Sequence, residues 1–163
     1  MTKRPEAADD PNRTVPVRRP PAEWRILIVD DHPLVRRGLK ALIDGEPDLL
    51  VCGEAATHRA GLEAVASLRP GLVIADLSLG DGDGLETVRE IRAGHRDLPV
   101  LVLSMHDLPV YAERALRAGA GGYVSKQEMG EVVLVGVRRL LGGGRFLSPK
   151  MKSGRRSPML RAP

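Results

Sequence analysis

The sequence predicts an α/β fold built on a single doubly wound, five-stranded parallel sheet, and two repeating patterns support this prediction. Short continuous runs of Ile, Val and Leu recur along the chain, as in parallel strands that helices cover on both faces. Between these runs, apolar residues recur at helical spacing. Strand and helix patterns that alternate in this way are typical of an open sheet with helices on both sides.

Each predicted element can be placed from its pattern. Strands are expected at residues 26–29, 49–52, 72–75, 100–103 and 122–124. The third of them runs into one acid and then a glycine-rich segment, so we expect this strand to end in a loop. The apolar stripes of the helices lie at residues 35–42, 62–66, 85–91, 110–118 and 133–141, the fourth made mostly of alanine.

Polar side chains follow four of these strands at the point where each strand ends. Asp30 and Asp31 follow the first, Asp76 the third, Ser104 the fourth and Lys126 the fifth. In doubly wound sheets, ligands bind beyond the carboxyl ends of the strands, near a topological switch point. We therefore expect these side chains to converge on one site.

The chemistry of this site follows from its residue types. Three carboxylates brought together would repel one another and shift one another's pKa. A divalent cation with a preference for hard oxygen ligands, Mg²⁺, is the expected remedy. Lys126 and the hydroxyl of Ser104 would complete a pocket of phosphate size, because an ammonium and a hydroxyl both donate to phosphoryl oxygens. The nucleophile would be Asp76.

This constellation resembles the receiver domain of two-component response regulators. The resemblance covers residues 25–141 and implies a flavodoxin-like (α/β)5 fold. Residues 29–39 and 103–107 are further similar to the NarL/FixJ subgroup, whose members usually add a LuxR-type helix-turn-helix. The residues that carry the resemblance, by their order and spacing, are Asp30-Asp31, Asp76, Ser104, Tyr123 and Lys126.

The resemblance implies a role for each residue of the site. Asp76 would take a phosphoryl group from phosphohistidine on a sensor histidine kinase. Asp31 and Asp76 would bind Mg²⁺ directly, together with the backbone carbonyl of Ser78, and Asp30 would act through water. Lys126 would pair with the phosphoryl oxygens.

The resemblance also implies a switch and an output. Ser104 would move toward the phosphoryl group, and Tyr123 would rotate into the vacated space. The surface change would act on a homodimer, a heterodimer with related regulators or another partner, and in this subgroup the usual output is transcription regulation. The chain would catalyse only its own phosphotransfer and autodephosphorylation, so it is not expected to be an enzyme.

Three alternatives stay beside this reading. Asp30 and Asp31 would also suit a turn that caps the next helix. A phosphatase of haloacid-dehalogenase type uses a strand-end aspartate too, but it needs a second aspartate two residues later, where this chain has Ser78. A phosphorylation-independent adaptor or decoy could use the same fold to dimerise with longer relatives.

Composition suggests a cytoplasmic protein with extensions at both ends. Its 42% hydrophobic residues suffice for a core, while no apolar run approaches the roughly 20 residues that span a bilayer. A lone cysteine, Cys52, permits no internal disulfide and fits a reducing compartment. Residues 1–24 are proline-rich and expected to be disordered.

The charge is concentrated in a C-terminal segment that is expected to be a flexible tail. Residues 142–163 hold six basic and no acidic residues, whereas residues 25–141 carry 14 basic and 17 acidic ones, a formal charge of −3. The tail has prolines and no apolar stripe, so it cannot form a helix-turn-helix, and no specific DNA binding is expected from this chain alone. A stand-alone receiver and a piece of a longer regulator both fit this sequence.

Overall fold

The structure, a computed structural model, describes residues 23–80 and 82–154. Its main sheet is parallel, with the strand order β2-β1-β3-β6-β7-β8. The chain places β2 on one side of β1 and all later strands of the main sheet on the other side. The topological switch point therefore lies between β1 and β3. This order of the first five strands is that of flavodoxin-like sheets, and it confirms the predicted α/β class.

All five predicted strands are present and one lies at the edge beyond them. The sixth, β8, pairs in parallel with β7 through Gly122 and Tyr123. A separate two-stranded antiparallel ladder, β4 with β5, follows β3. The strands of the main sheet are β1 (Trp24–Val29), β2 (Leu49–Ala55), β3 (Leu72–Ala75), β6 (Val100–Ser104), β7 (Gly122–Ser125) and β8 (Phe146–Leu147), and the small ladder joins β4 (Ser78–Leu79) to β5 (Gly82–Asp83).

The helices lie where the apolar stripes predicted them, with ends set by recognisable caps. Pro33 and Pro109 begin α1 and α4, where a missing backbone donor has no cost. Gly119 ends α4 with φ 111°, a left-handed conformation that favours glycine. The α-helices are α1 (Pro33–Asp44), α2 (His58–Leu68), α3 (Gly84–Gly94), α4 (Pro109–Ala118), α5 (Glu131–Leu141) and α6 (Pro149–Gly154), and a single 3₁₀ turn, η1 (Lys126–Glu128), follows β7.

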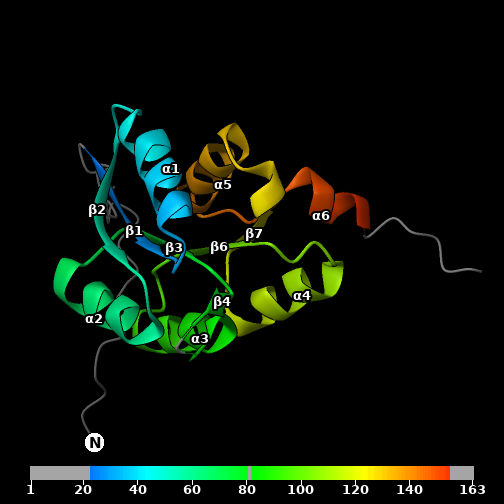
Figure 1. Cartoon of the computed structure of the whole chain (residues 1–163), viewed down its shortest axis with the longest axis horizontal. Coiled ribbons are helices and arrows are strands. Elements are labelled where there is room, and N and C mark those ends of the chain that lie inside the picture. The colour runs from blue at the N-terminus through cyan, green and yellow to red at the C-terminus, as the bar shows by residue number, and fades with distance from the viewer. Residues whose placement is uncertain (1–22, 81, 155–163) are drawn as a thin grey trace, which may run out of the picture.

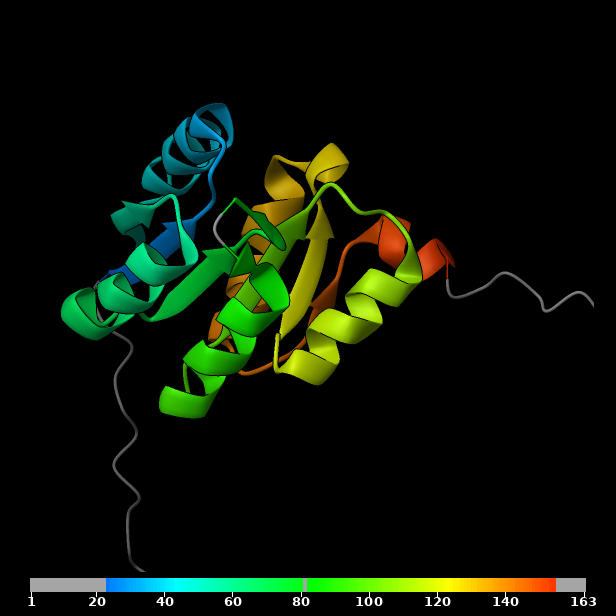
Figure 2. The same ribbon diagram turned by 60° about the horizontal axis from the view of Figure 1, so that its bottom comes forward.

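The sheet separates two apolar layers. Figure 1 shows α1 and α5 on one face and α2, α3 and α4 on the other, and Figure 2 shows the same layers from below. Side chains of β1 alternate between the layers: Ile26 and Ile28 pack toward α1 and α5, and Leu27 and Val29 toward α2 and α3. Continuous apolar strands are required because both faces are covered.

The expectation of a flexible tail from residue 142 onward is wrong for residues 146–154. This stretch forms β8 and α6, and Met151 is 1% exposed and belongs to the same core cluster as Tyr123. The order comes from tertiary contacts that a local sequence pattern does not display. The predicted disorder of residues 1–24 lies outside the described residues except at its end, where Trp24 already belongs to β1.

Among the described residues, no helix is both long and apolar enough to cross a membrane.

Candidate functional site

The strand ends bring the predicted polar residues to one edge of the sheet. The register pairs Val29 with Ala75, so Asp30 and Asp76 leave adjacent strands at the same level. Ala75 in turn pairs with Val102 of β6, and Ser104 of β6 pairs with the residue before Lys126. Four parallel strands thus deliver the site, as the sequence predicted.

Lys126 is the buried cation at the centre of this site. Its Nζ lies 2.8 Å from Oδ2 of Asp30 and donates to Oδ2 of Asp76 at 3.1 Å. All three side chains are at most 3% exposed. A lysine is buried at such a position only if carboxylates compensate its charge. Lys126 therefore joins two of the acids that were expected to converge unpaired.

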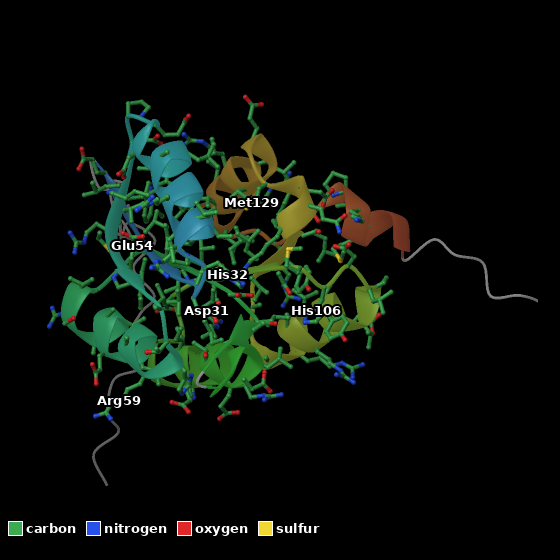
Figure 3. All side chains as sticks on the ribbon, in the orientation of Figure 1. Asp31, His32, Glu54, Arg59, His106 and Met129 are labelled. Carbon is green, nitrogen blue, oxygen red and sulfur yellow. The ribbon has the colours of Figure 1, made fainter. Side chains whose placement is uncertain are left out.

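Asp31 is left with a carboxylate oxygen that has no hydrogen bond. Its Oδ1 is buried and accepts none from the described residues, although Nδ1 of His32 lies 2.9 Å away. Figure 3 shows Asp31 and His32 next to each other. A buried oxygen without a donor is costly, so this atom is available to a cation.

The side chains of four residues could ligate one metal ion. Single ligand atoms of Asp30, Asp31, His32 and Asp76 all lie within 4.8 Å of one another. Three carboxylates and one nearby ammonium leave an excess of negative charge, and hard oxygen donors suit Mg²⁺. The N–H of Ser78 donates to Asp76, and its hydroxyl lies near His106. The predicted role of the Ser78 carbonyl as a metal ligand stays a prediction.

The surroundings of Asp76 shift the pKa of its carboxyl group. Burial raises the pKa of this carboxyl above its ordinary value and the charge of Asp30 adds to the rise, whereas hydrogen bonds from the backbone N–H of Ser78 and from Lys126 oppose it. The N–H of Ser78 donates to Oδ1 at 3.1 Å, and Lys126 occupies Oδ2. Both oxygens are therefore held in fixed directions.

The loop after Asp76 is kept close to the strand end by Gly84. A Cβ at this position would lie 2.3 Å from Cα of Leu77 and 2.4 Å from the carbonyl oxygen of Asp76. The first residue of α3 must therefore lack a side chain. Asp83 caps the helix by accepting from the N–H of Leu85 at 2.9 Å.

Ser104 and Tyr123 lie on neighbouring strands beside the acids, as predicted. Both are fully buried. Oγ of Ser104 accepts from the N–H of His106 at 3.1 Å, and the hydroxyl of Tyr123 donates to the carbonyl of His106 at 2.7 Å. Burial raises the pKa of Tyr123 to about 12, so the hydroxyl remains protonated and a donor. The predicted movements of Ser104 and Tyr123 stay predictions.

Two histidines belong to the site or its rim. His32 precedes α1, and its Nδ1 lies 2.9 Å from Oδ1 of Asp30 and 3.3 Å from Nζ of Lys126. His106 stacks on the ring of Tyr111 and places Nε2 3.4 Å from Oγ of Ser78. Figure 3 shows it on the α4 side of the acids. The signal for His32 was its position directly after the acid pair.

Comparison with known proteins agrees with this geometry. The family model of the response regulator receiver domain matches residues 26–136. The transcriptional regulatory protein UhpA of Escherichia coli (strain K12) is 34% identical over 138 residues, which cover 82% of this chain and 69% of UhpA. The transcriptional regulatory protein DegU of Brevibacillus brevis is 31% identical, over 78% of this chain but only 54% of DegU. These relatives are thus longer than the matched region.

Solved structures show the same relationship. A two-component response regulator of the LuxR family from Aurantimonas sp. SI85-9A1 superposes with a TM-score of 0.78 at 33% identity, covering 81% of this chain and 94% of that one. The isolated receiver domain of RcsB from Salmonella enterica serovar Typhimurium gives 0.75 at 25% identity, with 80% and 97% covered. From the strand-end acids, the buried lysine, the family model and these relatives, it follows that this chain belongs to the response-regulator receiver domain family.

Proposed function

We propose that the chain accepts a phosphoryl group on Asp76 from phosphohistidine of a sensor histidine kinase. The observation that carries this proposal is the buried carboxylate of Asp76, held by Lys126 on one oxygen and by a backbone N–H on the other. Burial that raises the pKa of a carboxyl also makes its ionised form more basic, and hence a better nucleophile.

The transfer would exchange one bond for another. A carboxylate oxygen of Asp76 forms a bond to phosphorus while the phosphorus–nitrogen bond of the donor histidine breaks, and the imidazole leaves with a proton from solvent. Lys126 stays within reach to donate to a phosphoryl oxygen as charge develops there. Asp31, Asp76 and, through water, Asp30 would hold Mg²⁺, which supplies neutralisation of the added negative charge.

The output would run through the surface around α4. A new dianion gives the hydroxyl of Ser104 a strong acceptor to follow, and Tyr123 is linked to the same turn through His106. One solved structure is described as two RcsB dimers bound to two parallel DNAs. We propose that phosphorylation of this chain likewise alters a dimer or partner surface, in the service of transcription regulation and without enzymatic turnover of another substrate.

Intact-mass spectrometry tests the phosphorylation directly. With Mg²⁺ and acetyl phosphate or phosphoramidate, the wild type should gain the mass of one phosphoryl group and lose it on treatment with base, as an acyl phosphate does. Asp76→Asn should gain none, and Asp97→Asn, which changes an exposed carboxylate, should behave as the wild type. The same gain in Asp76→Asn would refute the assignment, and no gain in the wild type would favour the phosphorylation-independent adaptor.

A further inference from the structure

Residues 146–154 form a strap that closes over the edge of β7 and over α4; we call it the C-terminal strap. Backbone hydrogen bonds attach it to β7 and to the residue before this strand. The N–H of Phe146 donates to the carbonyl of Gly121 at 3.1 Å, and the N–H of Ser148 donates to the carbonyl of Tyr123 at 3.0 Å. Met151 fills the core on the α4 side. Figures 1 and 2 show α6 beside the beginning of α4. The strap is therefore part of the folded domain.

Lys150 ties this strap to the two loops that carry the site. Its Nζ donates to Oδ2 of Asp107 at 2.9 Å, in the loop that follows Ser104. The same ammonium contacts Oε1 of Gln127, the residue directly after Lys126, and the backbone N–H of Lys150 donates to Oε1 of Glu128 at 2.9 Å. One strap residue thus bridges the loops after β6 and β7.

Asp107 is the centre of this bridge. Its other carboxylate oxygen accepts from the hydroxyl of Ser125, the residue before Lys126. The hydrogen bonds from Ser125 and Lys150 hold the pKa of Asp107 below its usual range, so the bridge is an ion pair at neutral pH. These contacts of Asp107 anchor the loop that follows Ser104.

We propose that the C-terminal strap, through the contacts of Lys150 with Asp107 and Gln127, restrains the site loops and opposes phosphorylation of Asp76. This inference rests on the proposed function and adds its regulation. A phosphoryl group on Asp76 draws the hydroxyl of Ser104 and the ammonium of Lys126 toward itself. Both movements shift the loops that Lys150 joins, so they strain the bridge.

Linkage makes the effect reciprocal. If the closed strap lowers the equilibrium constant for phosphorylation of Asp76 by some factor, phosphorylation lowers the equilibrium constant for closing the strap by the same factor. The side chains of Lys150 and Asp107 are 40% and 25% exposed, so their pairing has the strength of a partly solvated ion pair. Removing it should change the affinity for a phosphoryl mimic by roughly two- to fivefold.

The probe is beryllofluoride with Mg²⁺, in which a tetrahedral BeF₃⁻ group on a carboxylate oxygen stands in for the phosphoryl group. Titration followed by ¹⁹F nuclear magnetic resonance gives its affinity for the full chain. We expect Lys150→Ala and Asp107→Asn to bind it roughly two- to fivefold more tightly than the wild type. Lys152→Ala removes the same charge from the same helix, where the ammonium only lies 6.0 Å from the centre of the Phe146 ring, and should leave the affinity unchanged.

Hydrogen exchange of residues 146–154 gives the second readout. Beryllofluoride should speed exchange there in the wild type, and Lys150→Ala should do so without it. A wild type that binds no beryllofluoride would overturn the proposed function and this inference together. A wild type that binds it with unchanged exchange in the strap, and with the same affinity as Lys150→Ala and Asp107→Asn, would overturn the strap inference alone.

Discussion

Asp76 lies in an excess of negative charge that its neighbours only partly offset. Lys126 is shared with Asp30, and single side-chain oxygens of Asp30, Asp31 and Asp76 come within 4.8 Å of one another. The pKa of Asp76 is raised by burial. A carboxyl whose pKa is raised in the folded state stabilises the fold at pH values below its pKa in the unfolded state. This stabilisation is lost as the pH rises through the pKa of the folded state. At neutral pH the ionised side chain is therefore destabilising.

Asp76→Asn should for this reason raise the melting temperature at neutral pH without Mg²⁺, by roughly 2–4 °C. The amide keeps an acceptor for the N–H of Ser78 and removes the buried charge. Thermal unfolding followed by circular dichroism measures the change. Asp97→Asn, at an exposed position, should leave the transition where it is, and a lower melting temperature for Asp76→Asn would contradict the argument.

Asp30 and Asp31 are adjacent in the sequence but differ in their contacts. Oδ1 of Asp30 accepts from the N–H of His32 at 2.8 Å, and Oδ2 lies 2.8 Å from Lys126. None of the described residues donates a hydrogen bond to the buried Oδ1 of Asp31. The oxygen that most needs a cation is therefore on Asp31.

Asp31→Asn should weaken Mg²⁺ binding by about tenfold or more, and Asp30→Asn by less. Isothermal titration calorimetry with MgCl₂ gives both affinities. Trp24 begins β1 while the acids follow its end, so its fluorescence is a poor reporter of this site. Equal affinities in the two variants and the wild type would exclude a magnesium site at these acids.

The start of α3 fixes how closely the loop after Asp76 lies to the end of β3. Gly84→Ala would place a methyl group within 2.5 Å of the backbone of Leu77 and Asp76, and backbone atoms cannot yield as a flexible side chain can. We expect a loss of about 1–3 kcal/mol in the free energy of unfolding, together with slower phosphorylation. Gly94→Ala is the matched control, because nothing lies within 4 Å of its added Cβ.

Urea unfolding of both variants decides the point. Gly94→Ala, at the last position of the same helix, should be neutral or slightly stabilising, since alanine is the better helix former. If Gly84→Ala were as stable as Gly94→Ala, close packing of α3 on the strand end would not be what holds the loop.

Elements with a long apolar pattern could be predicted, and short ones could not. The five longer strands of the main sheet, the five longer helices and the convergence of polar residues follow from periodicity and from the geometry of parallel strand ends. The converging residues are Asp30, Asp31, Asp76, Ser104 and Lys126. The strand β8 has two residues, too few to show a period. Met151 is a single apolar residue between two lysines, and its burial depends on the surface left by α4 and β7.

The architecture of the whole domain also limits what its basic end can do. The described part of that end is occupied: β8 extends the sheet, and α6 contacts α4 and β7. Lys150 is paired with Asp107. A helix of six residues that packs on its own domain cannot serve as a recognition helix in a DNA groove.

We therefore expect this chain to bind DNA without sequence preference and only through its positive charge. Gel shifts with promoter and scrambled duplexes should give equal affinities that fall steeply with salt. Each phosphate contact should contribute about −0.9 to the slope of log K against log salt concentration. A chain that ends at Gly154 should bind more weakly, since three arginines follow this residue. A truncation at Gly144 is the wrong comparison, because it would also remove Met151 from the core. A complex that prefers one sequence and survives truncation at Gly154 would show that the folded domain itself reads DNA.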